Sequence, residues 1–295
     1  MIDAEVPAWW QALGLPGLFD VHTHFLPEPV QRKVFAQFDQ AGPKIGRPWP
    51  IRYRGTHGER VAQLRALGVR RFSSLPYAHR PGIATYLNDW ARGFSADVPD
   101  CLWSATFFPE PEAASYVTDL VEAGVEVFKV HVQVGEFDLT DPLLDKVWGT
   151  LEDSRTPVVV HAGSGPVGND FTGPDPLRSV LERFPALVVV VAHMGAPEYA
   201  QFVALAERYE HTMLDTTMVF TDFFEDGDPF PRDLVPRLAD LQDKVLLGSD
   251  FPTIPYPYAH QLEGLERLAL GDDWLRAVCW HNGCRVFGTP SPLAC

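Results

Sequence analysis

The chain has 295 residues, of which 46% are hydrophobic and 21% are charged. This composition excludes an intrinsically disordered chain, and the length suits one large domain with a sizeable core. The formal net charge of −15 argues against a nucleic-acid binder, because that function needs a basic surface. No run of about 18 apolar residues occurs, so we expect no membrane span. The first residues lack the pattern of a secretory leader, so we expect a cytoplasmic protein.

Eight short apolar runs, rich in β-branched residues, follow one another along the chain and predict eight strands. In chain order they cover residues 17–24, 69–75, 101–108, 125–131, 157–161, 187–193, 212–216 and 245–250. Most segments between them carry apolar residues at helical spacing. Two of these segments stop at a glycine, Gly68 and Gly124, and glycine is the residue favoured just after the end of a helix.

The runs also indicate how the strands pair. A continuous apolar run such as 187–192 is typical of a strand buried on both faces, as in a parallel sheet. Strands that alternate with helices favour the same conclusion. Eight units favour a closed barrel, and no Gly-x-Gly-x-x-Gly follows the first strand to indicate a dinucleotide fold. We therefore predict an α/β protein with the (β/α)₈ TIM-barrel fold, as one domain over residues 1–295.

A long insertion separates the first predicted strand from its helix. Residues 25–56 contain five prolines, and we expect an irregular segment there. Long connections of this kind are usually functional or disordered. Because the insertion follows the carboxyl end of a barrel strand, it would lie over the active-site mouth. We predict that residues 25–56 form a lid.

Side chains that can bind a metal stand where predicted strands end. His22 and His24 end the first strand and share one face, because strand side chains alternate. The fifth, sixth and eighth strands end at His161, His193 and Asp250. In a barrel these strand ends meet at one mouth. A single such histidine is usually structural, but five residues in register indicate a metal site. Nitrogen and oxygen donors favour zinc and leave manganese, iron or nickel open.

Three further polar residues are candidates for the same mouth. Lys129 and His131 share a face of the fourth strand, so a carboxylated Lys129 could bridge a second metal ion. The alternative, a lysine paired with a neighbouring acid, is the one we favour. His79 follows the second strand and is a candidate for the pocket wall.

The insertion reverses the charge of the chain. Between residues 29 and 56 it carries six basic residues and one acid, Asp39. Arg47, Arg52 and Arg54, with Trp49, predict an anionic and aromatic small-molecule substrate, since arginine binds carboxylates through paired hydrogen bonds. A solvated basic loop or a subunit contact explains the same charges, so a homodimer stays open.

Six short motifs, in their order and spacing, resemble the amidohydrolase superfamily, and most of all its amidohydrolase-related branch. They are Asp20–His24 (DVHTH), Lys129–His131 (KVH), Val160–Gly163 (VHAG), Ala192–Gly195 (AHMG), Gly248–Pro252 (GSDFP) and Asn282–Gly288 (NGCRVFG). The resemblance covers residues 17–288. Two departures stand out: some decarboxylases of the branch have Glu-x-His in place of His22-x-His24, and the last motif usually has alanine where this chain has Gly283.

The resemblance implies metal ligands at His22, His24, His161 and Asp250, and a catalytic role for His193. It implies a metal-dependent hydrolase, in which a metal-activated water attacks a C–O or C–N bond and Asp250 accepts the proton. A non-oxidative decarboxylase or hydratase of an aromatic or unsaturated carboxylic acid is the main alternative on the same site. A metal-independent lactonase is another. A catalytically inactive barrel used for binding is disfavoured, because all five positions are intact.

Overall fold

Eight strands occupy the eight positions that the apolar runs predict, in the computed structural model, which describes residues 1–288. The strands are β1 (Leu18–Asp20), β2 (Val69–Phe72), β3 (Ser104–Thr106), β4 (Val127–His131), β5 (Val158–His161), β6 (Val189–Val191), β7 (Thr212–Asp215) and β8 (Val245–Leu246). All eight are shorter than predicted: β4 and β5 keep their terminal histidines, whereas β1, β6 and β8 end before His22, His193 and Asp250. Residues 289–295 of the predicted domain lie outside the described residues.

The chain divides into two compact units. Of the described residues, the first comprises 1–72 and 216–288, and the second comprises 73–215. Within residues 1–288, no helix is long and apolar enough to cross a membrane.

In the first unit, the segments after β1 and β8 run side by side. β1 pairs in parallel with β2, with Leu18 opposite Val69. Beyond β1, the Val21 amide donates to the Leu247 carbonyl at 2.9 Å, and Thr23 forms a parallel bridge with Phe251. Backbone pairing therefore continues past both strand ends.

The helices of this unit come from both ends of the chain. They are η1 (Asp3–Glu5), α1 (Val6–Ala12), α2 (Glu28–Asp39), α3 (Gly42–Ile45), α4 (His57–Leu67), α11 (Asp222–Glu225), η4 (Arg232–Leu234), α12 (Val235–Asp240), η5 (Gln242–Lys244), α13 (Tyr258–Glu266), α14 (Asp272–Arg276), η6 (Ala277–His281) and α15 (Asn282–Phe287).

Two of these helices correct the expectation of an irregular insertion. Residues 25–56 contain α2 and α3. Their prolines, Pro29 and Pro43, stand in the first turn of each helix, where the missing amide hydrogen removes no helical bond. Proline in this stretch therefore marks helix starts as well as turns.

The start and stop of α4 follow from its sequence. The Thr56 side chain accepts from the Glu59 amide, and the Glu59 carboxylate accepts from the Thr56 amide at 2.8 Å, which is a capping box. The helix ends at Gly68 with φ of 85°, as predicted. A side chain at Gly68 would also meet the ring of Trp10 at 2.3 Å.

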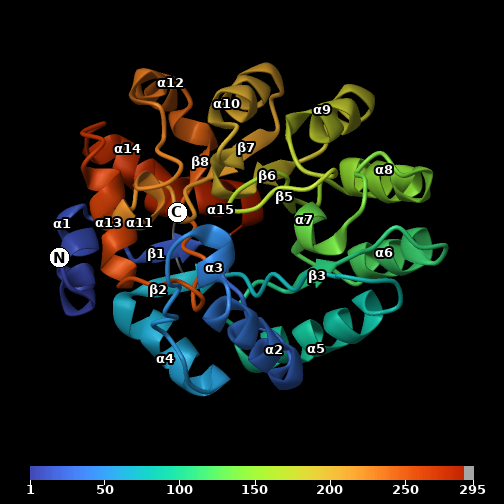
Figure 1. Ribbon diagram of the computed structural model, residues 1–295, viewed down its shortest axis with the longest axis horizontal. Coiled ribbons are helices and arrows are strands. Elements are labelled where there is room, and N and C mark those ends of the chain that lie inside the picture. The colour runs from blue at the N-terminus through green and yellow to red at the C-terminus, as the bar shows by residue number, and fades with distance from the viewer. Residues whose placement is uncertain (289–295) are drawn as a thin grey trace. The chain divides into compact units, whose positions relative to one another are not determined.

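The second unit is a sheet of five consecutive parallel strands, β3 to β7, with helices along it (Figure 1). Its helices are α5 (Ala84–Asp97), α6 (Ala113–Glu122), α7 (Val132–Gly135), η2 (Pro142–Leu144), α8 (Asp145–Ser154), α9 (Pro174–Arg183), η3 (Ala192–Gly195) and α10 (Tyr199–Arg208). The valines of β5 and β6 are all buried with no more than trace exposure, which confirms strands covered on both faces.

Candidate functional site

Three of the predicted ligands come together in the first unit. His22 and His24 follow β1, and Asp250 follows β8. The Asp250 amide donates to the His22 carbonyl at 2.9 Å, and the His24 amide donates to the Phe251 carbonyl at 2.7 Å. This backbone pairing places residues from opposite ends of the chain beside each other.

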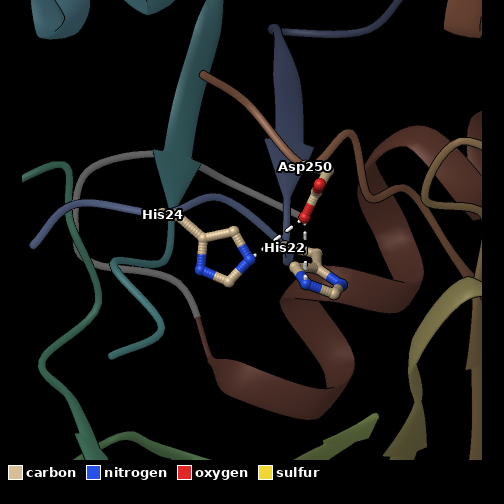
Figure 2. A group of neighbouring side chains, drawn as sticks. All are labelled: His22, His24 and Asp250. Atoms are coloured by element: carbon tan, nitrogen blue, oxygen red, sulfur yellow. Dashed lines mark ion pairs between the residues drawn. The ribbon is translucent and has the colours of Figure 1, made fainter. Parts of the chain in front are cut away.

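The side chains of this group converge (Figure 2). Nε2 of His24 lies 3.0 Å from Oδ1 of Asp250, and Nε2 of His22 lies 3.6 Å from the same oxygen. One ligand atom from each residue lies within 4.8 Å of the others, and all three residues are buried. Two imidazole nitrogens and a carboxylate oxygen, without a thiolate, suit zinc or manganese.

A buried carboxylate ties the two ligand-bearing segments together. Oδ1 of Asp20 accepts from the amides of His22, at 3.2 Å, and Ser249, at 3.1 Å. Oδ2 accepts from the Ser249 hydroxyl at 2.5 Å and from the Tyr258 hydroxyl at 2.9 Å. Burial first, and then the Asp20 charge, raise the pKa of Tyr258 well above its usual value, so its phenol remains a donor. Asp20 has no exposed surface, and its four bonds hold the residues next to the ligands.

The backbone at Asp250 is unusual. Its φ of 68° lies in the left-handed region, which few residues other than glycine adopt. The Thr253 amide donates to the Asp250 carbonyl at 3.0 Å and closes a tight turn.

The other predicted histidines gather in the second unit. The rings of His131 and His161 stack with centroids 3.8 Å apart and planes 11° apart. His193 packs against His161 edge to face, with centroids 4.7 Å apart. Nε2 of His161 donates to the Gly165 carbonyl at 3.2 Å, and the Asp215 carboxylate accepts from the His193 amide at 2.8 Å. Histidines predicted on three strand ends therefore form one cluster.

His193 begins a short left-handed stretch of backbone. Its φ is 54°, and those of Met194 and Gly195 are 51° and 74°. The stretch turns the chain sharply after β6, and His193 stays buried.

Lys129 and His79 differ in their surroundings. Lys129 is fully buried in β4, and its carbonyl accepts from the Thr106 hydroxyl at 2.8 Å. His79 is exposed. A bridging role for Lys129 and a pocket role for His79 stay predictions.

The insertion places its arginines in different settings. The Arg47 guanidinium lies 3.8 Å from the centre of the Phe223 ring. Arg54 pairs with Asp39, while Arg52 is exposed. Trp49 is buried. Arg54 is thus already committed to an acid, which leaves Arg47 and Arg52 as the better candidates for binding an anion.

Sequence reasoning missed the polar residues that support the ligands. Asp20 begins the first motif, but the sequence assigns it no role. Tyr258 belongs to no motif, and 238 positions separate it from its partner Asp20. Alternation of residue types predicts which strand residues share a face, but no local pattern predicts that the hydroxyl of Tyr258, on a helix distant in sequence, contacts Asp20.

Solved structures of other proteins share the fold of this chain. An uncharacterised TIM-barrel protein from Bordetella bronchiseptica matches with a TM-score of 0.73 and 17% identity, over 92% of this chain and 98% of its own. A 5-carboxyvanillate decarboxylase from Novosphingobium aromaticivorans, complexed with manganese and 4-hydroxy-3-methoxy-5-nitrobenzoic acid, matches with a TM-score of 0.63 and 13% identity, over 94% and 97%. A probable 2-pyrone-4,6-dicarboxylic acid hydrolase from Acinetobacter baumannii, with citric acid bound, matches with a TM-score of 0.60 and 15% identity, over 92% and 100%.

These likenesses establish the class of the protein: its fold is the (β/α)₈ TIM barrel, as the sequence predicted. The sequence profile of the amidohydrolase family matches residues 19–289, and the chain belongs to that family. The family consists of metal-dependent enzymes that act on small molecules. A search of the curated proteins found no significant match.

Proposed function

We propose that the chain is a metal-dependent hydrolase of a small anionic substrate. The observation that supports this proposal most strongly is the buried group formed by His22, His24 and Asp250, with ligand atoms within 4.8 Å of one another. Two imidazoles and a carboxylate buried side by side offer nitrogen and oxygen donors to one divalent cation, and this donor set fits zinc.

His22, His24 and Asp250 would hold the ion, and a ligand role for His161, which belongs to the second unit, stays a prediction. When bound, the ion supplies Lewis acidity, which lowers the pKa of a water to about 7 and polarises a carbonyl. Three protein ligands with an open position are typical of catalytic rather than structural zinc.

The chain's own residues would handle the proton. Asp250 is proposed to accept a proton from the attacking water at its carboxylate. His193, buried and in contact with His161, is proposed to polarise or protonate the substrate. Attack on a carbonyl carbon would then break the C–N bond of an amide or the C–O bond of an ester or lactone, and the leaving group would take the proton.

The anionic part of the substrate is proposed to meet the segment 25–56, acting as a lid. Arg47 supports this role, because its guanidinium stacks on Phe223 and forms no ion pair with an acid among residues 1–288. Single Arg47→Ala and Arg52→Ala variants should raise KM with a smaller effect on kcat, since they remove binding more than chemistry. An unchanged KM in both variants would contradict the anionic substrate.

A second candidate is a non-oxidative decarboxylase. It is supported by the similarity to a decarboxylase whose structure holds manganese and a hydroxylated, nitrated benzoic acid. In that reaction Asp250 or His193 would protonate the ring carbon as carbon dioxide leaves. Carbon dioxide release from hydroxybenzoates, measured beside hydrolysis of lactones and esters, separates the two candidates.

The metal content of each chain tests both candidates. We expect about one zinc or manganese ion per chain in protein purified without added metal or a histidine tag, and loss of the ion in His22→Ala. His281→Ala, an exposed histidine of the same unit, is the matched control and should keep it. A ratio of about two metal ions per chain would favour Lys129 as a bridging ligand. Folded, active protein without metal would overturn the proposal in favour of the metal-independent lactonase.

A further inference from the structure

The two oxygens of the Asp250 carboxylate have different neighbours. Oδ1 faces the two histidines, at 3.0 Å from His24 and 3.6 Å from His22. Oδ2 accepts from the Thr253 hydroxyl at 3.0 Å. One oxygen of the Asp250 carboxylate therefore faces the predicted metal ligands, and the other is held by a hydrogen bond.

Thr253 is well placed to fix this division. It is 2% exposed, and its hydroxyl also lies 2.9 Å from the Asp250 carbonyl. That carbonyl already accepts from the Thr253 amide at 3.0 Å, so the single hydroxyl proton is better used on Oδ2. A carboxylate rotates easily about its last torsion, because that torsion has a broad, two-fold profile. A bond to Oδ2 stops this rotation and keeps Oδ1 on the histidine side.

Thr253 is itself held by the segment 25–56. The Trp49 indole donates to the Thr253 carbonyl at 2.7 Å, and the Arg52 amide donates to the Ile254 carbonyl at 3.0 Å. Trp49 is buried, and its ring packs edge to face on Phe223 with centroids 4.9 Å apart. The end of the segment is thus attached to the turn that carries Asp250.

We propose that Thr253 is a positioning residue that sets the orientation of the Asp250 carboxylate, and that Trp49 holds Thr253 in place. The segment 25–56 and the metal-binding carboxylate are then mechanically coupled: if the segment lifts, the turn after Asp250 loses its support. The inference rests on the proposed metal site. It assigns these two residues a role that a covering lid alone would not have.

The test compares Thr253→Val, which keeps the shape and removes the hydroxyl, with Thr253→Ser, which keeps the hydroxyl. The dissociation constants for Zn²⁺ and Co²⁺ are measured by competition with a chelator, and the visible spectrum of the Co²⁺ protein reports ligand geometry. Groups that orient a metal ligand typically change metal affinity by about 10- to 100-fold when removed. We expect Thr253→Val to lose affinity within this range and to alter the Co²⁺ spectrum.

Thr253→Ser should recover affinity to within a few-fold of the unsubstituted protein, and Trp49→Phe should fall between them. Thr140→Val is the matched control, because the Thr140 hydroxyl donates to the Asp138 carboxylate at 2.8 Å in an exposed turn. It should leave metal affinity unchanged.

Each outcome decides the matter. If Thr253→Val binds both metals as tightly as the unsubstituted protein, with the same spectrum, the inference fails and the metal site stands. A serine variant as weak as the valine variant also overturns it, since packing and not the hydroxyl would then be responsible. If the unsubstituted protein binds neither metal, both the proposed function and this inference are wrong.

Discussion

Replacing Arg60 by methionine should stabilise the protein. Arg60 stands in the first turn of α4 and is 1% exposed. Its two terminal nitrogens have no hydrogen-bond partner among the described residues, while Nε donates weakly to the Thr56 carbonyl at 3.4 Å. The guanidinium lies 5.6 Å from the ring centres of both Phe25 and Phe35. A buried charge is therefore held by two aromatic faces and by the attraction of Glu28.

The magnitude follows from the pKa. Burial lowers the pKa of Arg60 to about 10, and each unit of difference between folded and unfolded chains corresponds to about 1.4 kcal/mol. Against the usual value above 12, the charged side chain destabilises the fold by about 3 kcal/mol. Two cation–π contacts offset about 1 to 2 kcal/mol. Methionine has a similar length and needs no hydration, so we expect a net gain of about 1 to 2 kcal/mol.

The pH dependence has a definite sign. The folded pKa is the lower one, so the unfolded chain holds the proton more tightly. The penalty is complete at pH values below 10 and declines only as pH rises through the folded pKa. The gain from Arg60→Met is therefore fully present at neutral pH.

Thermal unfolding at pH 7 measures the effect, with Arg65→Met, an exposed arginine of the same helix, as the control. A gain of about 1 to 2 kcal/mol corresponds to a rise in Tm of about 2 to 3 °C in a chain of this length, because the entropy of unfolding is about 2.1 cal/mol/K per residue. Arg65→Met should leave Tm nearly unchanged. A Tm for Arg60→Met below that of the unsubstituted protein would refute the reasoning, because it would show that the contacts of the guanidinium outweigh its lost hydration.

Three smaller predictions concern α4 and the end of the chain. Burial lowers the pKa of His57, so the free energy of unfolding should decrease as pH falls below about 6.5. His57→Gln should weaken this pH dependence, measured by denaturant titrations at several pH values, whereas the control His281→Gln should not. Thr56→Ala removes the helix cap and should lower the unfolding free energy by about 1 kcal/mol, seen as an earlier urea midpoint with an unchanged slope. Gly283→Ala places a methyl 2.6 Å from a ring carbon of Phe19 and should lower Tm; an unchanged Tm would show that the ring gives way.

The positions of the strands could be predicted because each depends on a local run of apolar residues. Val189–Val191 reads as a buried strand without knowledge of its partners, and the glycine after Leu67 ends a helix wherever that helix packs. The meeting of His22 and His24 with Asp250 was also predictable, since the carboxyl ends of parallel barrel strands converge.

What could not be predicted depends on contacts between distant segments. Prolines in residues 25–56 predict a loop, but two of them stand in the first turns of helices. The hydroxyls of Thr253 and Tyr258 donate to buried carboxylates, but no sequence motif of threonine or tyrosine predicts such a hydrogen bond. Sequence periodicity predicts which face of an element is buried, but it does not predict which polar atoms form hydrogen bonds there.

The left-handed backbone at Asp250 and His193 restricts how these positions can change. A replacement has to supply the right chemistry and also adopt φ values of 68° and 54°. Asparagine, aspartate and histidine do so more readily than most residues, and β-branched residues do so worst. Among the folded variants of a random library at either position, β-branched residues should therefore be rare. For the same reason Asp250→Asn is the substitution that removes the charge while leaving the turn intact.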